Sequence, residues 1–150
     1  MTNAMSAPET VGSVRVNRVE LSLAADAQML FLARMTAAAV ASRADFDLEQ
    51  VEDLRLAIDE LCVRLMNAGA GAARISLVFQ WDASELDVLG TLVPEGGPTS
   101  NGHHASAVDS GISYELSGRI LDALVDGHGD DIVGGVHRAW LQMKRVGHLA

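Results

Sequence analysis

The chain is poor in cysteine and lysine, and each shortage argues against a class of protein. Among its 150 residues, Cys62 is the only cysteine, so neither a disulfide framework nor a cysteine-based zinc cluster is available. Lys144 is the only lysine, and the net charge is −9. Neutralising phosphates requires a basic face, so direct nucleic-acid binding is not expected. A basic protein partner suits this composition better.

Long apolar runs are also missing. No segment is long and apolar enough to span a bilayer, and the N-terminus lacks the basic stretch followed by an apolar stretch of a secretory signal. We therefore expect a cytoplasmic protein without membrane contact. Hydrophobic residues make up 49% of the chain, as in an ordinary globular protein. We expect residues 1–12 to form a disordered tail and residues 13–150 to form a single domain.

Hydrophobic periodicity predicts one strand and two helices in the first half of the chain. Residues 14–23 alternate as a half-buried strand does, and residues 25–43 are rich in helix formers. Asp47 is a suitable N-cap for the second helix, and Gly69 and Gly71 are expected to end it through a left-handed exit. Its apolar positions with three/four spacing are Leu48, Val51, Leu54, Ile58, Leu61 and Leu65.

The second half begins with an antiparallel hairpin predicted from alternation in residues 74–81 and 85–93. Residues 94–111 have no apolar periodicity and are rich in Gly, Pro and Ser, which indicates a lid-like loop. Residues 113–125 favour a third helix.

Residues 135–145 read as a last strand, which follows a turn around Gly127 and Gly129. The turn region also holds His128, Asp130 and Asp131. The whole order favours helices layered on one face of a largely antiparallel sheet. The predicted fold is an α/β (α+β) two-layer sandwich.

The second helix carries a family motif. The segment VEDLRLAIDELCVRLMNAG, residues 51–69, resembles the N-box helix of the anti-sigma-factor serine kinases, a branch of the GHKL ATPase superfamily. Glu60 and Cys62 fit the pattern, whereas Arg64 stands where an asparagine is expected. The order of elements is similar to that family's histidine-kinase-like ATPase (Bergerat) fold.

The resemblance implies a kinase that uses ATP and magnesium. Glu60 would be the general base that takes a proton from a substrate serine, and the asparagine would hold the magnesium. Arg64 has only donors and a permanent positive charge, so it cannot ligate a cation, although it can touch a phosphate. We therefore expect at most weak or vestigial ATP binding without magnesium, and no protein metal site.

Helical geometry groups the polar candidates. Leu56, Glu60, Arg64 and Asn67 fall on one side of the helix, away from its apolar stripe. Asn67 is a candidate polar ligand, displaced by about one turn from the lost asparagine. The alternative is that Glu60 and Arg64 form an exposed i, i+4 ion pair.

Two further family motifs are altered. Pro94 replaces the aspartate of an Asp-x-Gly turn that contacts adenine. Glu95, Gly96 and Gly97 follow it and form either a substitute site or a glycine-rich turn without ligand.

The last glycine box retains Gly118, followed by Arg119. In the family this box leads into a helix whose N-terminus presents backbone N–H groups to phosphate. The alternative is a Ser-Gly pair inside a helix. His103 and His104 beside Asp109 lack a spaced third ligand, so we expect no metal there.

The altered motifs favour binding over catalysis. Holding a sigma factor requires only a shaped surface, whereas phosphoryl transfer needs magnesium, base and phosphate cradle together. The leading hypothesis is a homodimeric anti-sigma factor that sequesters a sigma factor and is released by an anti-anti-sigma factor. The alternatives are an active serine kinase acting on that antagonist, and an unrelated ligand-sensing α/β domain.

Overall fold

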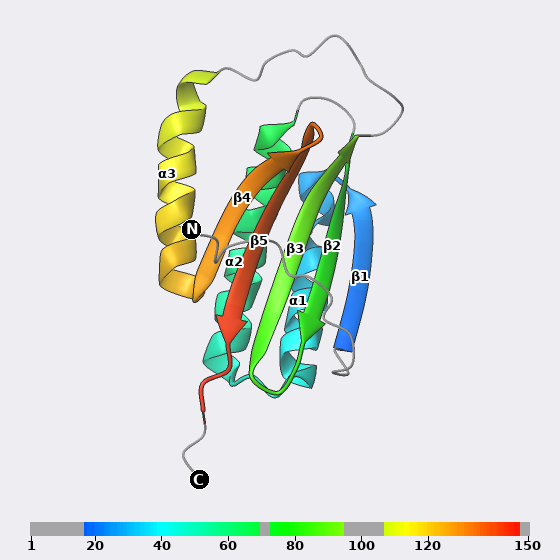
Figure 1. Ribbon diagram of the computed structural model, residues 1–150, viewed down its shortest axis with the longest axis vertical. Helices are drawn as coiled ribbons and strands as arrows, with labels where there is room; N and C mark the ends of the chain where they lie inside the picture. Colours follow the sequence, from blue (N-terminus) through cyan, green and yellow to red (C-terminus); the bar gives the residue numbers. More distant parts are fainter. Residues whose placement is uncertain (1–16, 70–72, 95–106, 148–150) are drawn as a thin grey trace.

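The computed structural model describes residues 17–69, 73–94 and 107–147 (Figure 1). The elements are β1 (Asn17–Ala24), the 3-10 helix η1 (Ala27–Met29), α1 (Leu30–Arg43), α2 (Leu48–Ala68), β2 (Ala73–Trp81), β3 (Glu85–Pro94), α3 (Ala107–Leu124), β4 (Gly127–Val133) and β5 (Val136–Lys144). The strands form one sheet in the order β1-β2-β3-β5-β4, and all neighbours are antiparallel. The predicted α+β two-layer sandwich is confirmed.

Helix α2 is the centre of the fold. It contacts α1 on one side, α3 on the other, and the inner strands β3 and β5 beneath it (Figure 1). Asp47 caps the helix as predicted, because its Oδ1 accepts a hydrogen bond from Gln50 N at 2.8 Å. The buried stripe of the helix consists of Val51, Leu54, Ile58, Leu61 and Leu65.

The prediction that Leu48 belongs to the buried stripe is wrong. Leu48 is 78% exposed, because it begins the first turn and lines a surface hollow at the α1–α2 connection instead of facing the sheet. Cys62 is buried as expected, and burial raises the pKa of its thiol to about 12. It serves as core packing.

The close approach of α2 to the sheet depends on Gly90 in β3. A Cβ at Gly90 would lie 2.7 Å from Leu65 Cδ1 and 3.2 Å from Leu61 Cδ2. The absent side chain therefore lets the leucines of α2 reach the backbone of the central strand.

The predicted turn around Gly127 and Gly129 is wrong, because these residues belong to β4. Gly129 pairs with Trp140 of β5, and a Cβ there would lie 2.6 Å from Cζ2 of that indole ring. The glycine makes room for an aromatic ring in the sheet. The chain turns instead at Gly134 and Gly135, whose φ angles are 59° and 81°, as a two-residue hairpin turn requires.

Two helix ends also differ from expectation. Helix α3 begins at Ala107, so the predicted loop 94–111 is helical in its last part. Helix α2 ends at Gly69 in an extended conformation, with φ −118° and ψ 148°, and not through a left-handed residue. Residues 1–16, which include the expected tail, and Gly71 lie outside the described residues. No helix in the described part of the chain combines the length and apolarity needed to cross a bilayer.

Candidate functional site

The predicted polar side of α2 lines a cavity. The cavity has a volume of about 160 Å³ and lies between α2, α3 and β4. Glu60, Arg64 and Asn67 all line it, as their shared helical face predicted. Leu56 does not reach it and is 55% exposed. The remaining walls are Val63 and Ala68 of α2, Ser113, Tyr114 and Ser117 of α3, and Asp130 of β4.

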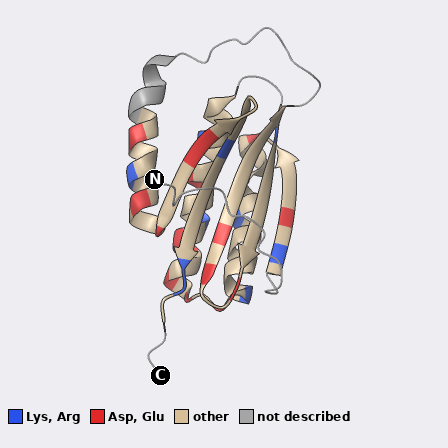
Figure 2. Ribbon diagram, viewed as in Figure 1, with Lys and Arg blue, Asp and Glu red and all other residues tan. Residues whose placement is uncertain are grey.

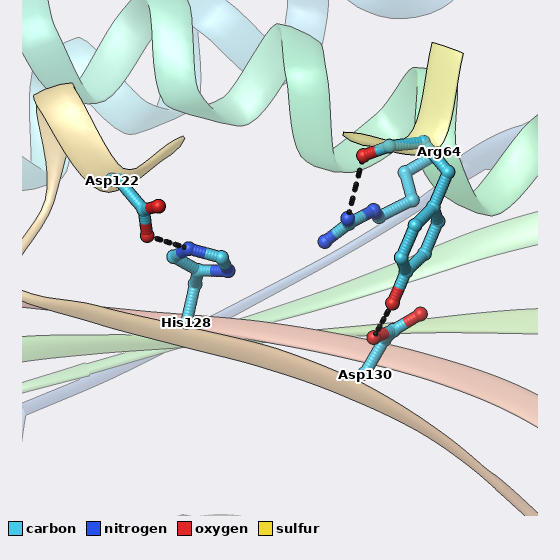
Figure 3. A network of polar contacts seen from close by, with 5 residues as sticks. Arg64, Asp122, His128 and Asp130 are labelled. Atoms are coloured by element: carbon cyan, nitrogen blue, oxygen red, sulfur yellow. Dashed lines mark hydrogen bonds and ion pairs between the residues drawn. The ribbon is translucent and has the colours of Figure 1, made fainter. Parts of the chain in front are cut away.

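Arg64 is bound from within the protein. Its guanidinium carbon lies 4.0 Å from the centroid of the Tyr114 ring, and its Nη2 donates a hydrogen bond to the Tyr114 carbonyl oxygen at 3.2 Å. The Tyr114 hydroxyl in turn donates to Asp130 Oδ1 at 2.7 Å, and this hydrogen bond is the main cause that raises the pKa of Tyr114. The dashed lines in Figure 3 mark both hydrogen bonds. These contacts join α2, α3 and β4.

Glu60 takes no part in this network. The i, i+4 ion pair with Arg64 considered from the sequence is wrong, because Arg64 turns to Tyr114 instead. Glu60 has no hydrogen bond or ion pair to another described residue, so its carboxylate faces the cavity without a partner.

Two buried polar atoms at the cavity have no hydrogen-bond partner among the residues that the structure describes. They are Arg64 Nε and Ser117 Oγ, and the Ser117 residue is 7% exposed. Buried donors without partners are uncommon in folded proteins and suggest a place for an acceptor atom.

A second hollow, of about 510 Å³, is also lined by Arg64 and Tyr114 and extends along β4 and β5. Its rim carries an ion pair in which Arg138 donates two hydrogen bonds to Asp131, at 2.8 and 2.7 Å. Hydrogen bonding from this guanidinium lowers the pKa of Asp131. The two hollows are neighbours, since Arg64, Ala68, Tyr114 and Asp130 line both of them.

The expected phosphate cradle at Gly118 is not a helix start. Gly118 lies well inside α3, so the surrounding backbone N–H groups are directed to carbonyl oxygens one turn earlier in the helix. Arg119 is exposed and does not line either hollow. Glu95, Gly96 and Gly97, with His103 and His104, lie outside the described residues. No metal-ligand cluster occurs among the residues that the structure describes.

Sequence reasoning missed the residues that hold Arg64. Tyr114 is the chain's one tyrosine, and Asp130 was assigned to a turn but lies in β4. A partly buried arginine is stabilised by an aromatic face or an acid, and the single tyrosine of the chain was the available sequence signal.

His128, another expected turn residue, also lies in β4. Its Nε2 is 2.6 Å from Asp122 Oδ1 near the end of α3 (Figure 3). This contact and the Tyr114–Asp130 hydrogen bond both tie α3 to β4.

Known proteins similar to the chain include the anti-sigma-F factor RsbW of Mycobacterium tuberculosis. The two sequences are 31% identical over 138 residues, a match that covers 87% of this chain and 76% of the relative. The chain belongs to the RsbW family. Proteins named serine-protein kinase RsbW are also similar: that of Bacillus cereus is 25% identical over 105 residues, covering 69% of this chain and 55% of the relative. That of Bacillus thuringiensis is 27% identical over 77 residues, covering 50% and 48%.

No family profile matches the chain. RsbW relatives are thus named both for sigma-factor inhibition and for serine phosphorylation. The cavity residues bear on which of these activities the chain has.

Proposed function

We propose that this RsbW-family chain is an anti-sigma factor that binds a sigma factor and does not need the kinase reaction to do so. The anti-sigma-F name of the M. tuberculosis relative, which matches most of the chain, supports the first part. The position of Arg64 supports the second part, because this cation stands at the magnesium-binding asparagine position and is held by Tyr114. The contact between Arg64 and Tyr114 is the observation that chiefly supports the proposal.

The residues present do not fit a magnesium-bound triphosphate. Arginine has no lone pair with which to ligate the ion, and the nearest carboxylate in the motif, Glu60, is the base of the implied kinase reaction. The helix start that would present N–H groups to phosphate is replaced by the continuous helix α3. We therefore propose at most weak, metal-independent ATP binding. Catalysis by Glu60, and contacts of ATP with Arg64, Asn67, residues 95–97, Gly118 and Arg119, remain predictions.

Charge supports a protein partner. Figure 2 shows Asp and Glu on the two helices that line the cavity, α2 and α3, and on strands β3 and β4. The net charge of −9 favours encounter with a basic surface and disfavours DNA. We propose a sigma factor as this partner, an anti-anti-sigma factor as the antagonist that releases it, and a homodimer of the chain as the binding unit.

Direct binding and transcription assays test the proposal. The purified full chain is titrated into RNA polymerase reactions, each programmed with one purified sigma factor of the source organism. Inhibition of one sigma factor, with matching binding in calorimetry, is expected. The absence of binding to every sigma factor tested would refute the anti-sigma function.

A second assay separates binding from the kinase alternative. The chain is incubated with labelled ATP, magnesium and purified candidate antagonists, beside a Glu60→Gln variant that keeps the size of the side chain. We expect no label on any antagonist. Transfer that disappears in the Glu60→Gln variant would establish the kinase instead.

Light scattering tests the proposed homodimer. It would give twice the chain mass of 15.9 kDa if the homodimer forms.

A further inference from the structure

Among the described side chains of residues 113–116 in α3, that of Tyr114 makes the polar and ring contacts with the rest of the protein. Among the α3 side chains described, from residue 113 onward, Ser117 and Leu121 are buried, whereas Tyr114 is 50% and Leu116 57% exposed. No core side chain therefore holds the described part of α3 before Ser117. Tyr114 supplies this attachment through its ring, its carbonyl and its hydroxyl.

We propose that Arg64, Tyr114 and Asp130 form a lock that keeps residues 113–117 of α3 docked on α2 without any nucleotide. A polyphosphate anion that binds the face of the Arg64 guanidinium covered by the Tyr114 ring must then displace that ring. The inference rests on the proposed function for its regulatory meaning, since it makes the docked position of α3 the default state of the anti-sigma factor. The lock itself is a property of the chain alone.

The charges that line the cavity disfavour a polyphosphate ligand and favour the contact of Arg64 with Tyr114. Arg64 lies in a cavity that is also lined by the carboxylates of Glu60 and Asp130. The three groups sum to one negative charge, so a polyphosphate entering the cavity meets net repulsion and an arginine already in use. The tip of Arg64 also reaches across to α3, because a Cβ at Gly118 would lie 3.7 Å from Nη2.

A second contact limits the expected loosening to the part of α3 before Ser117. The Asp122–His128 pair ties the other end of α3 to β4 (Figure 3). Leu121, next to Asp122 in the chain, is fully buried. Breaking the lock should therefore loosen the helix before Ser117 and leave its C-terminal turns in place.

Amide hydrogen exchange, followed by mass spectrometry on peptides of the full chain, tests the lock. In Arg64→Ala we expect exchange in residues 113–119 to rise about fivefold to tenfold, since a cation–π contact and a hydrogen bond are lost. Tyr114→Phe keeps the ring and should give a smaller rise, about threefold. Exchange in residues 121–125 should not change in either variant. These readouts do not require a sigma factor.

Arg119→Ala is the matched control, because Arg119 is an exposed arginine of the same helix that lines neither hollow. It should exchange like the wild type. Equal exchange of residues 113–119 in wild type, Arg64→Ala and Tyr114→Phe would overturn the lock. So would a rise of the same size in Arg119→Ala.

Ligand addition gives an independent arm. Millimolar ATP or inorganic tripolyphosphate, each with and without magnesium, should leave the exchange of residues 113–119 unchanged where the lock excludes the anion, or raise it where the anion displaces Tyr114. Added protection of these residues by magnesium and ATP would overturn the inference, because the nucleotide would then close the pocket. A chain that binds its sigma factor but shows this protection would refute the lock while leaving the proposed function intact.

Discussion

Removing the Ser117 hydroxyl should stabilise the protein. The hydroxyl is buried at the cavity between α2 and α3, and it has no hydrogen-bond partner in the described part of the chain. A buried polar group without a partner costs about 1–3 kcal/mol relative to solvent. Alanine removes that cost and leaves the rest of the side chain in place.

Two terms set the size of the effect. Alanine is also a better helix former than serine by about 0.5 kcal/mol, and residue 117 lies inside α3. Allowing for partial access of water from the cavity, we expect Ser117→Ala to raise the free energy of unfolding by about 1–1.5 kcal/mol. For a chain of this size the midpoint of thermal unfolding should rise by about 2–6 °C.

Ser113→Ala separates the two terms. Ser113 lies one turn earlier in the same helix and lines the same cavity, but it is exposed. This control should gain only the helix-propensity term, about 0.5 kcal/mol. Urea unfolding of both variants at neutral pH measures the difference. If Ser117→Ala is less stable than wild type, the hydroxyl has a strong partner and the reasoning on the cavity is refuted.

Two further predictions concern the sheet. Gly90→Ala should lower the free energy of unfolding by about 1–2 kcal/mol, because the new Cβ would lie 2.7 Å from Leu65 Cδ1 and overpacking outweighs the gain in strand propensity; a higher urea midpoint would contradict this. Asp131→Asn should lower the free energy of unfolding by about half a kcal/mol at pH 7, since the Arg138–Asp131 ion pair is partly exposed. Arg138 lowers the pKa of Asp131, so this stabilisation is present above the ordinary carboxyl pKa and is lost as pH falls through the lowered value. Wild type and variant should therefore converge in strong acid, and a difference that persists there would exclude the ion pair as its cause.

The parts of the fold that were predictable from sequence are those with a continuous hydrophobic period. Helix α2 carries such a stripe and a cap at Asp47, and the hairpin β2–β3 alternates cleanly, so both were found. The residues of β4 were assigned to a turn because its glycines resemble one, whereas Gly129 makes room for the ring of Trp140. That contact joins residues in different strands and leaves no local signal.

The candidate site was predicted in the same uneven way. Glu60, Arg64 and Asn67 share one helix, so helical geometry alone placed them on one cavity wall. Tyr114 and Asp130 come from other elements, and only the fold brings them to Arg64.

The affinity for a sigma factor with and without magnesium and ATP tests the central claim most directly. Calorimetry with the sigma factor identified by the transcription assay gives both dissociation constants. Because the proposed lock holds α3 on α2 without nucleotide, the two values should agree within about twofold. Binding that is about tenfold or more tighter in magnesium and ATP, and that is weakened by removing the nucleotide, would contradict the account.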